Sequence, residues 1–162
     1  MDFKGKKMVV IGMGKTGIAS ARFLGSQGAR VVAVDEKTPA HWGEEFDQIA
    51  NKEWLETAAY NTRVLESASM VIPSPGVPPH NDILVAAIKL NIPVVSEIEL
   101  AYRYLKVPII AVTGTNGKTT TTSLLGEIMV RAGKKVFVGR QNNVTVGKTH
   151  RGRKRQGRRQ IG

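Results

Sequence analysis

The sequence predicts an α/β protein in which parallel strands alternate with helices. An apolar run at 7–11 leads into Gly12-Met-Gly-Lys-Thr-Gly17 and then into a helical pattern. A β-branched run at 109–112 leads into Thr113-Gly-Thr-Asn-Gly-Lys-Thr-Thr-Thr-Thr122 and a second helical pattern. The order strand, glycine loop, helix is typical of phosphate-binding sites. We therefore expect a Rossmann-like parallel sheet domain, followed by the first strand, loop, helix and strand of a P-loop ATPase domain.

Hydrophobic periodicity predicts the remaining elements of this alternation. We expect strands over 7–11, 29–35, 70–73, 92–95, 109–112 and 134–138. We expect helices over 18–24, 82–90, 97–105 and 123–130, and helical spacing also fits 42–49 and 54–65. Asn81 is expected to cap the helix that follows it. Trp42 and Trp54 are expected to pack in the core.

The first glycine motif has the G-x-G-x-x-G spacing of dinucleotide-binding loops. Gly12 permits a tight turn, Gly14 lets a pyrophosphate approach the backbone, and Gly17 lets the helix pack close to the strand. Asp35 ends the next strand, 18 positions beyond Gly17, and is the candidate contact for a ribose or base. A turn without any ligand, with Asp35 as a solvated strand end, is the alternative.

The second glycine loop has the residue types that bind ATP phosphates. Gly114 and Gly117 let backbone N–H groups converge on one point, and Lys118 supplies a mobile cation for the β- and γ-phosphates. Thr119 or Thr120 can place a hydroxyl on Mg²⁺. The loop is shorter than G-x-x-x-x-G-K, because its first glycine is Gly114. A glycine turn that caps an amphipathic helix is the alternative.

A proline-rich loop, Ser74-Pro-Gly-Val-Pro-Pro79, ends the strand at 70–73. At the C-terminal edge of a parallel sheet this loop would line the same crevice as the first glycine motif. A purely architectural role is equally compatible with its composition. One α/β unit is complete before the second glycine loop, so a domain boundary is expected at 105–108.

Composition narrows the class of protein. The chain has 162 residues, 41% of them hydrophobic, and no cysteine, which excludes disulfides and thiolate metal sites and is compatible with a cytoplasmic location. No apolar run reaches the roughly 18 residues of a membrane span, so no membrane partner is expected. The net charge of +11 is uneven, because eight of the 24 basic residues and no acidic one fall within 140–162. We expect this basic tail to be disordered.

Four motifs together resemble the Mur ligases, the amide-forming ligases of peptidoglycan synthesis. They occur in the family order within residues 1–139: Gly12-Met-Gly-Lys-Thr-Gly17, Ser74-Pro-Gly-Val-Pro78, Ser96-Glu-Ile-Glu-Leu100 and Thr113-Gly-Thr-Asn-Gly-Lys-Thr-Thr-Thr121. The first loop and the Ser74 segment are most similar to the branch that adds D-glutamate to UDP-N-acetylmuramoyl-L-alanine.

The resemblance implies a domain organisation and a set of site residues. Residues 1–105 would bind UDP, 106–139 would begin the central ATP-binding domain, and 140–162 would be an unrelated tail. The implied substrate-binding residues are Gly14, Lys15, Thr16, Asp35, Glu36, Ser74, Pro75 and Gly76. The implied ATP-binding residues are Gly114, Thr115, Asn116, Gly117, Lys118, Thr119 and Thr120. Lys118 would be catalytic, and Thr119 would contact Mg²⁺ through ATP.

Members of the family continue for several hundred residues beyond this point. We therefore expect a truncated ligase that keeps its recognition loops and does not complete catalysis. Two other functions stay open at this stage. One is a stand-alone dinucleotide-binding protein, and the other is nonspecific nucleic-acid binding through the basic tail, which is the less favoured because the tail lacks interleaved aromatic residues.

Overall fold

The structure is a computed structural model that describes residues 2–105 and 107–139. Its internal contacts divide the chain into two compact units, of which the first ends at Val107 and the second begins at Pro108. The expected disordered tail at 140–162 lies outside the described residues. Among the helices in the described part, none has the length and apolar character needed to cross a membrane.

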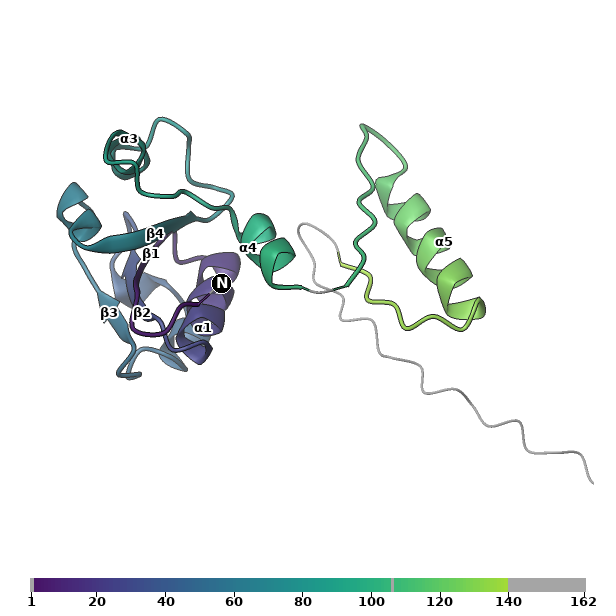
Figure 1. Cartoon of the computed structure of the whole chain (residues 1–162), viewed down its shortest axis with the longest axis horizontal. Coiled ribbons are helices and arrows are strands. Elements are labelled where there is room, and N and C mark those ends of the chain that lie inside the picture. Colours follow the sequence, from purple (N-terminus) through teal and green to yellow (C-terminus); the bar gives the residue numbers. More distant parts are fainter. Residues whose placement is uncertain (1, 106, 140–162) are drawn as a thin grey trace, which may run out of the picture. The chain divides into compact units, whose positions relative to one another are not determined.

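The first unit is built on a four-stranded parallel sheet (Figure 1). Its strands are β1 (Lys7–Ile11), β2 (Arg30–Val34), β3 (Leu55–Thr57) and β4 (Ala68–Pro73), in the order β3-β2-β1-β4. The strand order reverses between β1 and β4. The C-terminal ends of these two strands therefore flank a topological switch point, the position where ligands bind in open α/β sheets.

Helices cover both faces of this sheet. They are α1 (Lys15–Ser26), α2 (Glu44–Asp47), α3 (Asp82–Lys89) and α4 (Glu97–Tyr104), with short 3-10 helices η1 (Pro39–His41) and η2 (Thr62–Leu65). One buried cluster includes side chains from α1, α2 and α4, and the other includes side chains from α3 and η2. The unit is thus a three-layer α/β/α sandwich.

The apolar strands divide their side chains between the two layers. Val10 packs in the cluster that contains Ile18 and Leu24 of α1, whereas Val9 packs in the cluster that contains Ile83 of α3. All five of these side chains are at most 2% exposed. Burial on both faces explains why the central strands are continuous apolar runs, and each such side chain contributes about 1.5–3 kcal/mol.

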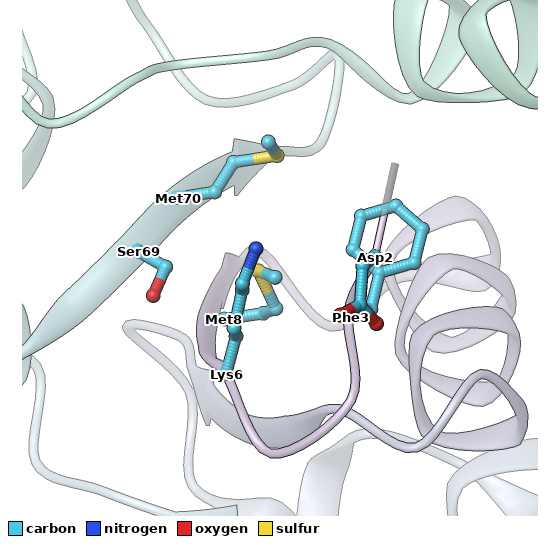
Figure 2. A pocket seen from close by; sticks show the side chains of 6 residues that line it. All are labelled: Asp2, Phe3, Lys6, Met8, Ser69 and Met70. Atoms are coloured by element: carbon cyan, nitrogen blue, oxygen red, sulfur yellow. The ribbon is translucent and has the colours of Figure 1, made fainter.

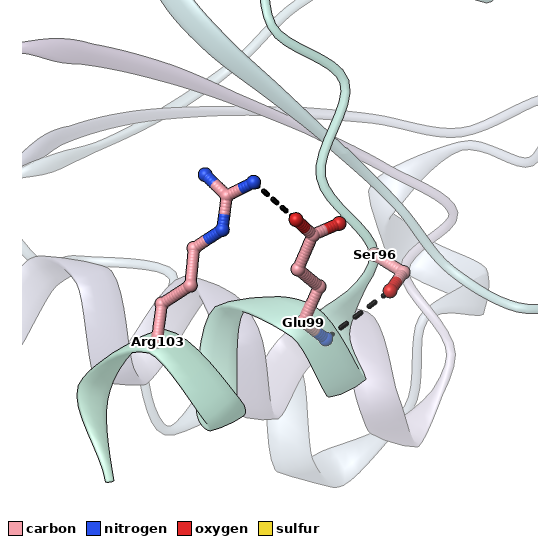
Figure 3. A network of polar contacts seen from close by, with 3 residues as sticks. All are labelled: Ser96, Glu99 and Arg103. Atoms are coloured by element: carbon pink, nitrogen blue, oxygen red, sulfur yellow. Dashed lines mark hydrogen bonds and ion pairs between the residues drawn. The ribbon is translucent and has the colours of Figure 1, made fainter. Parts of the chain in front are cut away.

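Helix α4 docks on α1 through aromatic contacts. The Phe23 ring meets the Tyr104 ring edge-on, with centroids 4.8 Å apart, and the Tyr104 hydroxyl donates to Oε1 of Gln27 at 2.6 Å. The N-terminus of α4 is capped by Ser96, whose hydroxyl accepts from the backbone N–H of Glu99 at 3.2 Å (Figure 3). The Glu99 side chain pairs with Arg103 one turn later.

The helical interpretation of residues 42–65 is largely wrong. Residues 42–49 form only the four-residue α2. Residues 54–65 form the edge strand β3 followed by η2. Strand β3 pairs in parallel with β2, so that Val31 lies beside Leu55. The apolar spacing arose because an edge strand and a 3-10 turn both place side chains against the sheet. Trp42 and Trp54 do pack with the core, as expected.

The strand expected at 92–95 is reduced to one bridge between Val94 and Val71 of β4. The backbone around it does bond to β4, since Val71 N–H donates to Pro93 O at 2.9 Å and Val95 N–H donates to Val71 O at 2.9 Å. Pro93 has no N–H to extend the ladder. The segment therefore lies beside β4 without becoming a regular strand.

The second unit contains α5 (Lys118–Arg131), which starts five residues before the helix expected at 123. The strands expected at 109–112 and 134–138 do not form, because neither segment pairs with another strand in the described part of the chain. The later segment packs on α5 instead. A Cβ on Gly126 would lie 2.6 Å from Cγ2 of Val138, so the glycine makes room for this contact.

Gly25 of α1 is predicted to resist substitution by alanine. A glycine-to-alanine change in an exposed helix usually stabilises it by about 1 kcal/mol, but here the new Cβ would lie 2.3 Å from the Trp54 ring. Overpacking should win, and Gly25→Ala should lower the free energy of unfolding by about 1–2 kcal/mol. Urea denaturation followed by tryptophan fluorescence measures this in the first unit, which contains both tryptophans. Ser26→Ala, at an exposed neighbour, is the control; a stabilised Gly25→Ala would contradict the prediction.

Loss of the buried cap of α3 is predicted to cost more than loss of the exposed cap of α4. Asn81 Oδ1 accepts from the N–H groups of Ile83 and Leu84 at 3.0 and 3.2 Å, and its amide donates to the Tyr60 hydroxyl. Asn81→Ala removes the cap and the Tyr60 contact and should cost about 2 kcal/mol. Ser96→Ala should cost about 1 kcal/mol or less. The same denaturation assay compares them, and a larger loss in Ser96→Ala would refute the expected order.

Candidate functional site

The glycine loop between β1 and α1 forms the floor of the candidate site. Gly12 has φ +86°, a conformation that favours glycine, and its N–H donates to Val34 O of β2 at 2.9 Å. The Met13 side chain points into the core and is 2% exposed. Gly14 is the N-cap of α1, and its carbonyl accepts from Ile18 N–H at 3.0 Å.

Gly17 lets α1 close against this loop. A Cβ at Gly17 would lie 1.9 Å from Gly12 O and 2.8 Å from the Ser74 hydroxyl, so no other residue fits without moving the backbone. A Cβ at Gly14 would meet nothing within 4 Å. Gly17 thus has the packing role that the motif predicts for it, and the space beside Gly14 is open.

The start of α1 is suited to bind an anion. Gly14, Lys15 and Thr16 are exposed, no side chain caps the helix, and its first turn contains no acidic residue. Helix N-termini carry unpaired N–H groups and the positive end of the helix dipole. A phosphate group placed here would meet both, with the Lys15 side chain starting from the same turn.

Asp35 is joined to the glycine loop directly. Its Oδ2 accepts from Met13 N–H at 2.6 Å, and its Oδ1 accepts from Lys37 N–H at 2.8 Å. The carboxylate therefore connects the end of β2 to the loop after β1. Sequence reasoning placed Asp35 at the site but missed the Met13 contact, which depends on β1 and β2 being neighbours.

Ser74 joins the same loop from the opposite side. Its hydroxyl donates to Gly12 O at 2.7 Å, and its backbone N–H donates to Ile11 O at 2.8 Å. Val77 also reaches the loop, because a Cβ at Gly12 would lie 3.1 Å from its Cγ2. The structure thus brings Gly12, Asp35 and Ser74 together. Exposed residues next to them in sequence complete the group: Glu36, Pro75 and Gly76.

The loop of the second unit also has an open helix N-terminus. Gly117 adopts the left-handed conformation, with φ +75°, and caps α5 without a side-chain bond. Lys118 folds back over the loop, and its Nζ donates to the carbonyls of Gly114 and Thr115. Thr119 and Thr120 are exposed in the first helical turn. Lys118 and the hydroxyls of Thr119 and Thr120 thus all lie in the first turn of α5, at its N-terminus.

The protein ligands for a metal ion at this loop are few. Within the described residues, no group of three or more His, Cys, Asp or Glu side chains could hold one. A threonine hydroxyl supplies one oxygen, whereas Mg²⁺ takes six ligands in octahedral geometry. The exposed Thr119 hydroxyl can supply one such oxygen ligand from the start of α5.

A pocket of about 190 Å³ lies at the N-terminal ends of β1 and β4, the opposite ends of these strands from the glycine loop (Figure 2). It is lined by Asp2, Phe3, Lys6, Met8, Ser69 and Met70. Ligands of open α/β sheets bind at the C-terminal ends of the strands. We therefore place the candidate site at the glycine loop and not at this pocket.

Comparison with protein families identifies the first unit. Residues 6–96, more than half of the chain, match the model of the N-terminal domain of MurD-like Mur ligases. The chain belongs to the MurD-like Mur ligase family. This confirms the resemblance of its motifs, and the sheet with its glycine loop is the N-terminal domain of that family.

Two curated relatives of this MurD-like chain share one name, UDP-N-acetylmuramoylalanine–D-glutamate ligase. The chain is 54% identical over 141 residues to the UDP-N-acetylmuramoylalanine–D-glutamate ligase of Syntrophus aciditrophicus, and 45% identical over 140 residues to that of Koribacter versatilis. Each match covers 86% of this chain and 31% of the relative. The chain thus spans about a third of the length of these relatives.

Solved structures support the fold. The ligase for UDP-N-acetylmuramate and L-alanyl-γ-D-glutamyl-meso-diaminopimelate from Neisseria meningitides has a TM-score of 0.54 at 21% identity, covering 88% of this chain and 45% of its own. The UDP-N-acetylmuramate–alanine ligase MurC of Thermotoga maritima has a TM-score of 0.52 at 24% identity, covering 83% and 31%. These likenesses confirm the α/β fold class predicted from the sequence.

Two glycines of the MurD-like loop are predicted to differ in their tolerance of alanine. Gly17→Ala pushes a Cβ against the Gly12 carbonyl, which is backbone and cannot rotate away, and should lower the free energy of unfolding by about 2–4 kcal/mol. Gly14→Ala adds a methyl group in open space and should change it by no more than about 0.5–1 kcal/mol. Tryptophan fluorescence in urea measures both variants. Equal stabilities would contradict the packing role of Gly17.

Proposed function

We propose that this chain carries the UDP-substrate site and the first ATP loop of a ligase that adds D-glutamate to UDP-N-acetylmuramoyl-L-alanine in peptidoglycan synthesis. The observation that carries the proposal is the glycine loop at the topological switch point, in a chain 54% identical to a ligase of that name. Residues 1–105 are proposed as the UDP-binding domain and 106–139 as the start of the ATP-binding domain.

The open start of α1 supports a diphosphate at the first loop. Backbone N–H groups of Lys15 and Thr16 would face the phosphate oxygens, because the helix start is exposed and uncapped. Asp35 and Glu36 follow β2 on the side proposed for the uridine. The loop from Ser74 to Gly76 lines the crevice from β4.

The second loop is proposed to bind ATP with Mg²⁺. Lys118 would exchange its contacts with loop carbonyls for the β- and γ-phosphates, whose charge attracts the ammonium more strongly. The residues from Gly114 to Gly117 would direct N–H groups at the phosphates, and the hydroxyls of Thr119 and Thr120 would contact phosphate and metal.

The reaction proposed for the whole ligase, which this chain alone is not expected to complete, makes an amide bond. The muramoyl-alanine carboxylate attacks the γ-phosphorus of ATP, and ADP leaves with the β–γ bridging oxygen. The amine of D-glutamate then attacks the acyl phosphate and releases phosphate. Lys118 would stabilise the charge that develops on the transferred phosphoryl group. We propose the cytoplasm as the location, since ATP is the proposed energy source.

A stand-alone dinucleotide-binding function is the second candidate. The observation that favours it is the G-x-G-x-x-G spacing of residues 12–17, followed by Asp35 after the next strand. The fold is also similar to that of a precorrin-2 dehydrogenase, SirC, with a TM-score of 0.53 at 14% identity. That likeness concerns the fold alone, and one fold supports many functions. We give it less weight than the family match. The basic residues that would bind nucleic acid lie at 140–162, outside the described residues, and we propose no nucleic-acid partner.

Ligand titration of the 162-residue chain tests the proposal. We expect UDP-N-acetylmuramoyl-L-alanine to bind more tightly than NAD in calorimetry, because the family match points to a uridine nucleotide. Lys118→Ala should weaken ATP binding by about tenfold or more, through loss of a charge-assisted contact, and leave the UDP-sugar affinity unchanged. Lys134→Ala, an exposed lysine beyond α5, is the matched control. Tighter NAD binding, or no UDP-sugar binding, would refute the proposed function.

A further inference from the structure

The glycine loop is held from both neighbouring strands. From the β2 side, Val34 O accepts from Gly12 N–H at 2.9 Å, and Asp35 Oδ2 accepts from Met13 N–H at 2.6 Å. From the β4 side, the Ser74 hydroxyl donates to Gly12 O at 2.7 Å. Three consecutive polar groups of the loop backbone, Gly12 N–H, Gly12 C=O and Met13 N–H, thus have fixed partners.

The Gly12 carbonyl oxygen lies in a confined position. It is 1.9 Å from where a Gly17 Cβ would stand, and the same Cβ would be 2.8 Å from the Ser74 hydroxyl. The oxygen is therefore enclosed between α1 and Ser74, on the packed side of the loop. Without Ser74 it would lose its hydrogen-bond donor, and a carbonyl in such a place is costly to leave unpaired.

The single hydroxyl proton of Ser74 decides what this side chain can do. A serine hydroxyl donates one hydrogen bond, and here the proton is given to Gly12 O. The oxygens of a diphosphate are acceptors and need a donor. The Ser74 hydroxyl therefore does not serve a phosphate while it holds the loop.

We propose that Ser74 is a positioning residue, which together with Asp35 clamps the glycine loop in its phosphate-binding shape. Ser74 acts on the diphosphate through the loop and does not touch it. The clamp keeps the Gly12 carbonyl on the packed side, so that the start of α1 presents N–H groups and no carbonyl to the ligand. This inference rests on the proposed function, because it takes the ligand of the loop to be a uridine diphosphate.

Comparing UDP with uridine tests the inference, since uridine lacks the phosphates. In NMR titrations of the full chain, Ser74→Ala should weaken UDP by about fivefold, the effect of one hydrogen bond, and change uridine by less than about twofold. Ser74→Thr keeps the hydroxyl and should restore UDP affinity. Ser69→Ala, an exposed serine of β4, is the matched control. Equal weakening of UDP and uridine, or no weakening of either, would overturn the positioning role.

Amide exchange of Met13 gives a second measurement that needs no ligand. Asp35→Asn leaves one side-chain oxygen for two backbone donors and should speed exchange at Met13 by about tenfold, with Glu53→Gln as the control at an exposed carboxylate. If Ser74→Ala proves unfolded by tryptophan fluorescence, Ser74→Cys, a weak donor of similar size, replaces it and should also weaken UDP alone.

The two proposals fail in different ways. If the unaltered chain does not bind UDP, the proposed function is refuted. The exchange rate of the Met13 amide still tests whether Asp35 holds the glycine loop. Unchanged Met13 exchange in Asp35→Asn would overturn the clamp even where UDP binds.

Discussion

The contact between α1 and the loop after β1 is the constraint on which the first unit depends. Gly17 stands against the Gly12 carbonyl with room for hydrogen alone, and this closeness sets where the helix begins and how it lies on the sheet. Ile18 and Leu24 reach the core because the helix lies there. The same contact leaves Gly14 and the first helical N–H groups exposed. One packing requirement thus produces both the core and the candidate phosphate site.

The strand order brings residues from three strand ends together at the candidate site. Asp35 follows β2 and Ser74 follows β4, so both reach the loop after β1 because that strand lies between the other two. Dehydrogenases with a similar sheet also bind ligands at this edge. The fold therefore indicates where a candidate site lies, and the family match is the reason for proposing a uridine nucleotide there.

The second unit forms part of the geometry expected of a phosphate-binding loop. Gly117 and the α5 N-terminus have the expected geometry, because a left-handed glycine and a helix start are local features. The neighbouring apolar side chains of Ile109, Ile110 and Phe137 are exposed. Their backbones lack partner strands within the described residues, so the loop stands here without the sheet expected to support it.

The sequence by itself determined the features that depend on a few adjacent residues. These include β1, the span of α3, its Asn81 cap and the close packing of α1 at Gly17. Tertiary structure decided the features that depend on distant neighbours. Residues 54–65 became an edge strand and a 3-10 turn because β2 offered an unpaired edge, and Pro93 limited its segment to one bridge. The contacts of Asp35 and Ser74 with the loop also required the strand order, because hydrogen bonds between strands join residues whose separation in sequence leaves no local pattern.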